Sequence, residues 1–290
     1  MSCDSYYGIG DKHQVCQDYA LHGSIPGMEY AIVADGCSGA PFSEIGAQIL
    51  CHAAKYQIAL SYSTGLFKEC SAGTLSSILG NSIFKRICEI STSYPISRKA
   101  LEATLFIAVK TEDAKFVFGW GDGVVIYQYK DESGLHKIVC DIDYPANAPF
   151  YLACNPEEYL KNLQSRGYDD PKVLYTQYHI EDDGSFSSEI KNYPVDKPYS
   201  WKSMAPYMSE EGGLTEEVDI VSISVCTDGI KSFQDEKKSP IQLMEMLPEV
   251  VGYKTTDGEF VKKRMFFLKR KAKKNNWLHS DDLGCGTIFF

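Results

Sequence analysis

Two apolar runs of the chain each end on an aspartate that is followed by a glycine. The first run, AIVADG, covers residues 31–36, and the second, VSISVCTDG, covers residues 221–229. Apolar runs with β-branched residues predict buried strands. An ionised carboxylate at the end of such a strand is costly unless a cation or a hydrogen-bond donor faces it. The glycine after it lets the backbone turn sharply and approach a ligand closely.

Asp35 and Asp228, the two aspartates in question, therefore suggest a shared site at the ends of two strands. Such a site suits a hard cation such as Mg²⁺ or Mn²⁺, because these ions prefer oxygen ligands. From this pair alone, two unrelated strand-to-turn junctions are an equally open interpretation.

Four further aspartates belong with this pair. Asp18 follows the segment GDKHQVCQ at residues 10–17, and Asp122 lies in a Gly-Asp-Gly turn between two expected strands. Asp281 and Asp282 precede the last expected strand. Several carboxylates cannot ionise side by side without repulsion, which divalent cations would remove. Two such ions can share a water, lower its pKa and orient an in-line displacement.

The elements that would position these residues follow from the hydrophobic pattern. Strand patterns alternate with short polar turns through the first and middle parts of the chain, and helical spacing occurs in two pairs of segments. We expect two strands within residues 18–35, helices at 42–60 and 74–90, strands at 103–109, 115–120, 124–130 and 136–140, a strand ending at 228, helices at 240–251 and 258–274, and a strand at 286–290. This order predicts antiparallel sheets with helices stacked outside, and not a parallel doubly wound fold.

The composition excludes few classes of protein. The chain has 290 residues, of which 44% are hydrophobic and 23% charged, with a net charge of −10. This acidity argues against a general nucleic-acid binder. The sequence shows no secretory signal and no run long enough to span a membrane. The ten cysteines contain no C-x-x-C pair, so we expect reduced thiols in a cytoplasmic protein.

Five motifs together carry a resemblance. They are the segment from Gly10 to Asp18, Val33 to Gly39, Gly121 to Gly123, Thr227 to Gly229, and the pair Asp281-Asp282. In this order they resemble the metal-dependent serine/threonine protein phosphatases, the family of protein phosphatase type 2C, over residues 10–290. The resemblance implies an α+β fold, a four-layer α/β/β/α sandwich with two mostly antiparallel sheets flanked by helix pairs. It also implies a single domain, residues 1–290, with a variable flap at about 150–215.

The resemblance also implies roles for individual residues. Asp35 would bridge two Mn²⁺ or Mg²⁺ ions, and the Gly36 carbonyl would bind one of them. Asp228 and Asp281 would complete the other shell, with Asp282 the less favoured ligand of its pair. Asp18 would bind metal through water, and Asp122 would offer a third and weaker ion position together with Asp228. His13 would contact the phosphate. A catalytic part is implied for His13, Asp18, Asp35 and Asp228.

Several positions depart from the common pattern of that family. His13 stands where arginine is usual, Cys16 replaces asparagine, and Gln17 replaces a glutamate that helps to hold one metal ion. Gly123 replaces serine. The start H-x-x-C-Q-D is similar to that of a divergent, mostly prokaryotic branch. The loss of a carboxylate at position 17 would weaken one metal site.

The expected function is hydrolysis of phosphoserine or phosphothreonine by a metal-activated water. The partner would be a phosphorylated protein, either a kinase target or the kinase itself, with no nucleic acid and no membrane. A catalytically weak or inactive relative that acts as a regulatory binding module is the main alternative. Asp141-Ile142-Asp143 leaves open a phosphatase that forms an aspartyl-phosphate. The basic run 262–274 is read as the solvated face of a helix, or else as a guide for an acidic partner.

Overall fold

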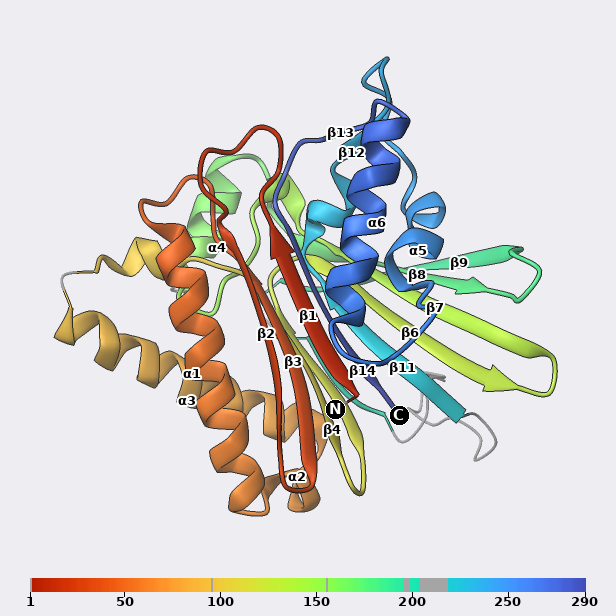
Figure 1. Cartoon of the computed structure of the whole chain (residues 1–290). Helices are drawn as coiled ribbons and strands as arrows, with labels where there is room; N and C mark the ends of the chain where they lie inside the picture. The colour runs from red at the N-terminus through yellow and green to blue at the C-terminus, as the bar shows by residue number, and fades with distance from the viewer. Residues whose placement is uncertain (1, 95, 155, 196–198, 204–218) are drawn as a thin grey trace.

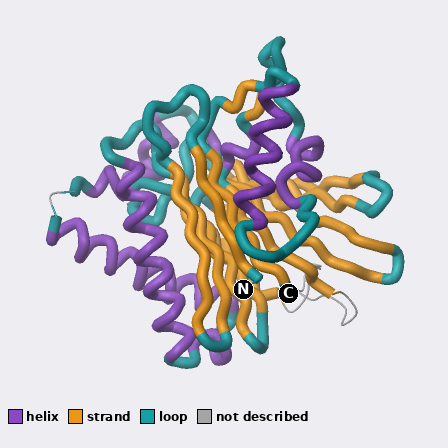
Figure 2. The backbone as a smooth tube through the Cα atoms, in the orientation of Figure 1, coloured by secondary structure: helices purple, strands orange, loops and turns teal. Residues whose placement is uncertain are grey.

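The computed structural model describes the chain except for residues 1, 95, 155, 196–198 and 204–218. Its strands form two large antiparallel sheets, and helices cover the outer face of each (Figures 1 and 2). This arrangement confirms the predicted four-layer α/β/β/α sandwich.

The smaller of the two large sheets carries the first aspartate motif. Its strands are ordered β10-β5-β4-β3-β2. Their bounds are β2 Asp18–Ile25, β3 Met28–Asp35, β4 Leu105–Thr111, β5 Lys115–Trp120 and β10 Tyr199–Ser203. The helices α1 (Ser43–Ser63), α2 (Leu66–Glu69) and α3 (Ala72–Ser93) pack on this sheet and bury a layer of aliphatic and aromatic side chains against it.

The larger sheet carries the second motif, in the strand order β1-β14-β11-β6-β7-β8-β9. Its bounds are β1 Cys3–Gly8, β6 Gly123–Asp131, β7 Gly134–Asp143, β8 Lys172–Ile180, β9 Phe186–Pro194, β11 Asp219–Cys226 and β14 Leu283–Phe289. The helices α5 (Leu243–Val251) and α6 (Phe260–Lys274) cover its outer face. Short elements complete the described chain: the helix α4 (Pro156–Ser165), the 3₁₀ helices η1 (Arg98–Leu101), η2 (Pro145–Asn147) and η3 (Asp228–Lys231), and the strand pair β12 (Phe233–Gln234) and β13 (Leu278–His279).

The inner faces of the two sheets meet in a third apolar layer. Val33 and Phe106 from the smaller sheet pack there with Val125, Ile223 and Ile288 from the larger one. These side chains alternate along their strands with side chains that face the helices, as expected for sheets buried on both faces. The site predicted at the strand ends lies at the end of the sandwich where β3, β11 and the start of β14 meet.

The segment from 150 to 215, for which the sequence predicts a flap, has regular structure in its described parts. The turn at residues 181–184 joins β8 and β9 as an antiparallel hairpin. β8 pairs with β7 and so extends the larger sheet, and β10 pairs with β5 in the smaller one. A flap over the site stays a prediction, as does the single-domain boundary at 1–290, and part of the segment lies outside the described residues.

The basic run near the C-terminus is the helix α6. Its apolar residues Phe260, Val261, Met265 and Leu268 are buried, whereas Phe266 and Phe267 are exposed. Within the described residues, no helix is long and apolar enough to cross a membrane.

Candidate active site

Asp18 and Asp35 lie opposite each other at the end of the β2–β3 hairpin. Asp18 is only 3% exposed, and its carboxyl group shares a hydrogen bond with that of Asp35. Burial raises the pKa of both groups, and the charge of Asp228 raises both further. A proton between two such carboxylates supplies the positive charge that a bound cation would otherwise supply.

Thr227 connects this hairpin to the other sheet. Its hydroxyl donates a hydrogen bond of 2.6 Å to Asp18 Oδ2 and accepts one of 2.8 Å from the backbone N–H of Gly284. Thr227 directly follows β11 and directly precedes Asp228. The position of Thr227 directly before Asp228 is the sequence feature that could indicate its role at this site.

Gly36 follows Asp35 in a place that admits no side chain. Its N–H donates to the carbonyl of Gln17 at 3.2 Å. A Cβ atom at Gly36 would lie 2.6 Å from the carbonyl oxygen of Ser43. The glycine is therefore needed for the close approach of α1 to the end of β3.

Asp228 and Asp281 are brought together by strand pairing. Cys226 at the end of β11 is the register partner of Cys285 in β14, so the residue after β11 lies beside the residues before β14. Burial raises the pKa of Asp228 to about 6; the charge of Asp281 raises it too, and the ammonium of Lys231 opposes the shift.

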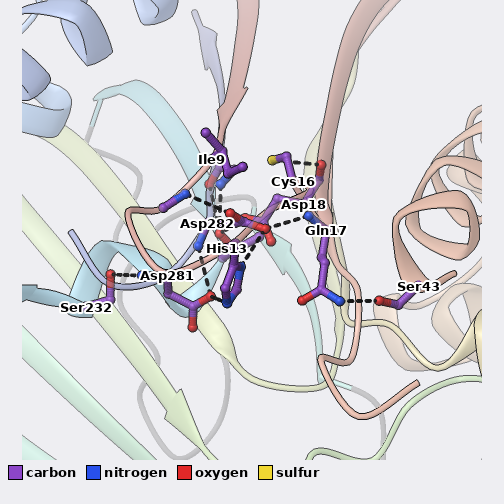
Figure 3. A network of polar contacts seen from close by, with 12 residues as sticks. Ile9, His13, Cys16, Gln17, Asp18, Ser43, Ser232, Asp281 and Asp282 are labelled. Carbon is purple, nitrogen blue, oxygen red and sulfur yellow. Dashed lines mark hydrogen bonds and ion pairs between the residues drawn. The ribbon is translucent and has the colours of Figure 1, made fainter. Parts of the chain in front are cut away.

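Asp282 is committed to hydrogen bonds with the N-terminal segment. Its Oδ1 accepts from the N–H of Gly10 at 2.8 Å, and its Oδ2 accepts from the N–H of Gln17 at 2.5 Å. His13 Nδ1 lies 3.0 Å from the same Oδ2. The Asp281 side chain, by contrast, is 41% exposed; Figure 3 shows the two side chains on either side of His13. Asp281 Oδ1 accepts from the N–H of Asp282 at 2.9 Å, and Asp281 is the more exposed carboxylate of the two.

His13 lies between both of these carboxylates, with Nε2 at 3.5 Å from Asp281 Oδ1 (Figure 3). Its hydrogen bond with Asp282 is the main cause of a raised pKa, because the carboxylates stabilise the imidazolium form. The side chain is 22% exposed.

Gln17 and Cys16, the two other unusual residues of this segment, have structural partners. The amide of Gln17 donates to Ser43 Oγ at 2.8 Å. Burial raises the pKa of Cys16 to about 12, which leaves its thiol protonated and a poor nucleophile. Free thiols account for all ten cysteines.

Asp122 occupies the tight turn between β5 and β6. Gly121 before it has φ +93°, a conformation that favours glycine. Asp122 is 6% exposed, and its Oδ1 has no hydrogen-bond partner among the residues that the structure describes. Burial raises the pKa of Asp122 to about 8, and the charge of Asp228 adds to the shift.

Lys231 is a cation of this region that no local sequence pattern indicates. Its Nζ lies 2.8 Å from Asp141 Oδ1 and 2.5 Å from Asp143 Oδ1. These two aspartates are the D-x-D pair considered for an aspartyl-phosphate mechanism. They lie on β7, which runs antiparallel to both β6 and β8. The fold is therefore not the parallel one typical of that chemistry, and that hypothesis is wrong.

A cavity of about 420 Å³ lies between η1 and α4. Its lining includes Tyr151 and Cys37, which follows Gly36 in the chain. Burial is the main cause of the raised pKa of Tyr151, and the charges of Asp122 and Asp35 raise it further. Three basic side chains and two acidic ones belong to the same wall: Arg98, Lys99, Arg166, Glu102 and Glu158.

The donor set fits hard divalent cations. Buried carboxylates with raised pKa values and a buried, unsatisfied Asp122 oxygen all favour a cation nearby. As they stand in the described residues, no three His, Cys, Asp or Glu side chains are grouped so that they could hold an ion. Binding of an ion would displace the proton shared by Asp18 and Asp35.

The family assignment rests on the sequence of nearly the whole chain. Residues 10–265 match the family model described as "Protein phosphatase 2C". The chain belongs to the protein phosphatase 2C family. The predictions of this family, and of a phosphatase of its serine/threonine class, are therefore confirmed.

Solved structures show the same fold at low sequence identity. A serine-threonine phosphatase 2C from Toxoplasma gondii is 12% identical, with 99% of this chain and 94% of that chain covered and a TM-score of 0.54. The serine/threonine phosphatase of S. agalactiae is 13% identical, with 99% and 98% covered and a TM-score of 0.50. PppA, a regulatory component of T6SS in Pseudomonas aeruginosa, has the same identity and score, with 99% and 97% covered. No curated protein sequence matches this phosphatase 2C chain.

Proposed function

We propose that this protein is a metal-dependent phosphoprotein phosphatase that hydrolyses phosphoserine and phosphothreonine at a binuclear Mn²⁺ or Mg²⁺ centre. One observation carries the proposal. Asp18 and Asp35 from one sheet meet Thr227 and Asp228 from the other sheet, and Thr227 is hydrogen-bonded to Asp18. A buried group of carboxylates at the junction of two sheets is too costly to keep without a cation that uses it.

The proposed ligands are Asp35, the carbonyl of Gly36, Asp228 and Asp281, with Asp18 acting through water. Two bound ions would lower the pKa of a water and orient it for attack on phosphorus. The protein's own contribution is to fix these oxygens on strand ends. The hydroxyl of Thr227 orients Asp18, and the pairing of β11 with β14 places Asp228 next to Asp281.

His13 is the proposed phosphate contact. Asp281 and Asp282 hold its ring and favour the imidazolium form. A protonated imidazole donates a charge-assisted hydrogen bond to a phosphoryl oxygen. This role would replace that of the arginine usual in the family.

The cavity between η1 and α4 is the proposed seat of the peptide around the phosphorylated residue. Arg98, Lys99 and Arg166 outnumber the two glutamates on its wall, so the cavity would favour a substrate with acidic or phosphorylated neighbours. The partner proposed here is a phosphorylated signalling protein, either a kinase target or the kinase itself.

Hydrolysis of a phosphothreonine peptide tests the proposal. We expect turnover with Mn²⁺ or Mg²⁺, none with excess EDTA, and a loss of at least 100-fold in kcat/KM for Asp228→Asn. A phosphotyrosine peptide of the same sequence is the control for specificity. Turnover that persists in EDTA would contradict the metal-dependent mechanism, and equal rates on the two peptides would contradict the specificity.

The regulatory binding module is the second candidate function. It is favoured by Gln17, whose amide is hydrogen-bonded to Ser43 where the family pattern has a metal-holding glutamate. A Mn²⁺ titration together with the peptide assay separates the two candidates. A binding module would bind phosphopeptide without turnover, and Gln17→Glu would then be expected to strengthen Mn²⁺ binding and to restore hydrolysis.

A further inference from the structure

Two carboxylates hold the ammonium group of Lys231 at the edge of the proposed metal centre, and its charge acts on two more. It makes ion pairs with Asp141 at 2.8 Å and with Asp143 at 2.5 Å. Its positive charge also opposes the rise in pKa that burial causes at Asp122 and Asp228.

The backbone explains why these five groups meet. Asp228 and Lys231 are the first and last residues of the 3₁₀ helix η3, and residues three apart in a 3₁₀ turn lie on the same side. Asp141 and Asp143 are two apart on β7 and so share one face of the sheet.

The register of β6 and β7 brings Asp122 to the same place. Gly123, the residue after Asp122, is the register partner of Ile142, which lies between the two aspartates bound to Lys231. The Asp122 side chain is more than nine-tenths buried, and in the described part of the chain its Oδ1 lacks a hydrogen-bond partner. A buried carboxylate oxygen without a donor needs positive charge nearby.

We propose that Lys231 supplies the positive charge beside Asp122 and Asp228 that a third metal ion would otherwise supply, so that the centre takes two divalent ions and not three. The third position expected from the sequence for Asp122 with Asp228 is then taken by an ammonium that belongs to the chain. This inference rests on the two-ion centre proposed above. A third divalent ion would be repelled by Lys231, which two ion pairs hold in place.

The stoichiometry of Mn²⁺ binding tests this assignment without reference to activity. We expect calorimetric titration of the full chain to give two ions for the wild type and three for Lys231→Met, since that variant leaves four carboxylates uncompensated. Lys231→Arg keeps the charge and should bind two. Asp122→Asn in the Lys231→Met background should return the count to two. Lys237→Met removes the same charge from an exposed lysine six positions along the chain. It is the matched control and should also bind two.

A second variant keeps the test decisive where Lys231→Met does not fold. Asp122→Asn alone should still bind two ions, because Asp122 holds no ion in the wild type. Loss of one ion in Asp122→Asn, three ions in the wild type, or two ions in a folded Lys231→Met would each overturn the assignment. A wild type that binds no Mn²⁺ and hydrolyses no phosphopeptide would overturn the proposed function itself, whereas two ions in both wild type and Lys231→Met would overturn only the role of Lys231.

Discussion

Asp281 and Asp282 are neighbours in sequence but have different surroundings. Asp282 is buried and accepts hydrogen bonds from the backbone of Gly10 and Gln17. Asp281 is partly exposed, and its backbone N–H is fixed by Ser232 Oγ at 3.1 Å. The buried carboxylate therefore anchors the N-terminal segment, and the exposed one is available to an ion.

This difference predicts opposite phenotypes for the two isosteric substitutions. Asp281→Asn should weaken Mn²⁺ binding at least tenfold and leave the unfolding free energy of the ion-free protein within about 0.5 kcal/mol of wild type. Asp282→Asn removes charge-assisted hydrogen bonds from a buried site and should destabilise the ion-free protein by about 2 kcal/mol. Urea unfolding in EDTA and Mn²⁺ titration of both variants check this pair.

The pair is its own control, because the chemical change is the same at adjacent positions. If Asp282→Asn weakened Mn²⁺ binding more than Asp281→Asn and kept full stability, the ligand assignment would have to be reversed.

At the scale of single residues, the sequence predicts those site residues whose role follows from a local sequence pattern. Asp35 and Asp228 were found because each ends an apolar strand and precedes glycine. The ion pairs of Lys231 with Asp141 and Asp143 join residues about ninety positions apart, and no local pattern indicates them. The choice between Asp281 and Asp282 was open for the same reason, since it depends on contacts with residues near the N-terminus.

At the scale of elements, β1 and α6 are linked by a cap that is remote in sequence. The first turn of a helix leaves N–H groups without partners, and Glu259, the residue before α6, provides no side-chain cap. Asp4 in β1 fills this role, because its Oδ2 accepts from the N–H of Val261 at 2.6 Å and from that of Lys262 at 3.2 Å.

Asp4→Ala should therefore destabilise the protein by about 1–2 kcal/mol, as other losses of helix caps do. Asp4→Asn keeps an acceptor oxygen but loses the charge that favours a helix N-terminus, and should cost about 0.5–1 kcal/mol. Urea unfolding measures both. Asp257→Ala removes an exposed carboxylate near the same helix end and should change the stability little. An Asp4→Ala variant as stable as wild type would show that the cap contributes nothing.

Strong periodicity explains which elements the sequence predicted well. The strand expected at 115–120 coincides with β5, and the helix expected at 42–60 is α1, Ser43–Ser63. β1 was missed because its sequence, CDSYYG, has little apolar alternation and is a strand through its pairing with β14. The placement of β8 and β9 beside β7 likewise depends on long-range pairing, which periodicity does not encode.

At the scale of the whole molecule, the candidate site is a junction between the two sheets. Carboxylates from β3 and from the turn after β11 face each other there, and burial keeps several of them protonated above their ordinary range. The pKa of Asp228 is raised to about 6 and that of Asp122 to about 8, from an ordinary value of 3.8. The ion-free folded protein therefore holds protons that the unfolded chain has released.

Stability should follow from this difference in bound protons. Because the folded state binds more protons than the unfolded chain between about pH 4 and pH 8, these groups make the ion-free protein less stable as the pH rises through that range.

Divalent ions favour the ionised carboxylates and displace the protons, so they bind more tightly at higher pH. Ions at about 100 times their Kd add roughly 2.7 kcal/mol for each site. We thus expect Mn²⁺ to raise the Tm by a larger amount at pH 8 than at pH 6. Thermal melts in EDTA and in Mn²⁺ at both pH values measure this, and Asp122→Asn should flatten the pH dependence seen in EDTA. A Mn²⁺ effect of equal size at both pH values would mean that the buried carboxylates at the sheet junction do not exchange protons for metal.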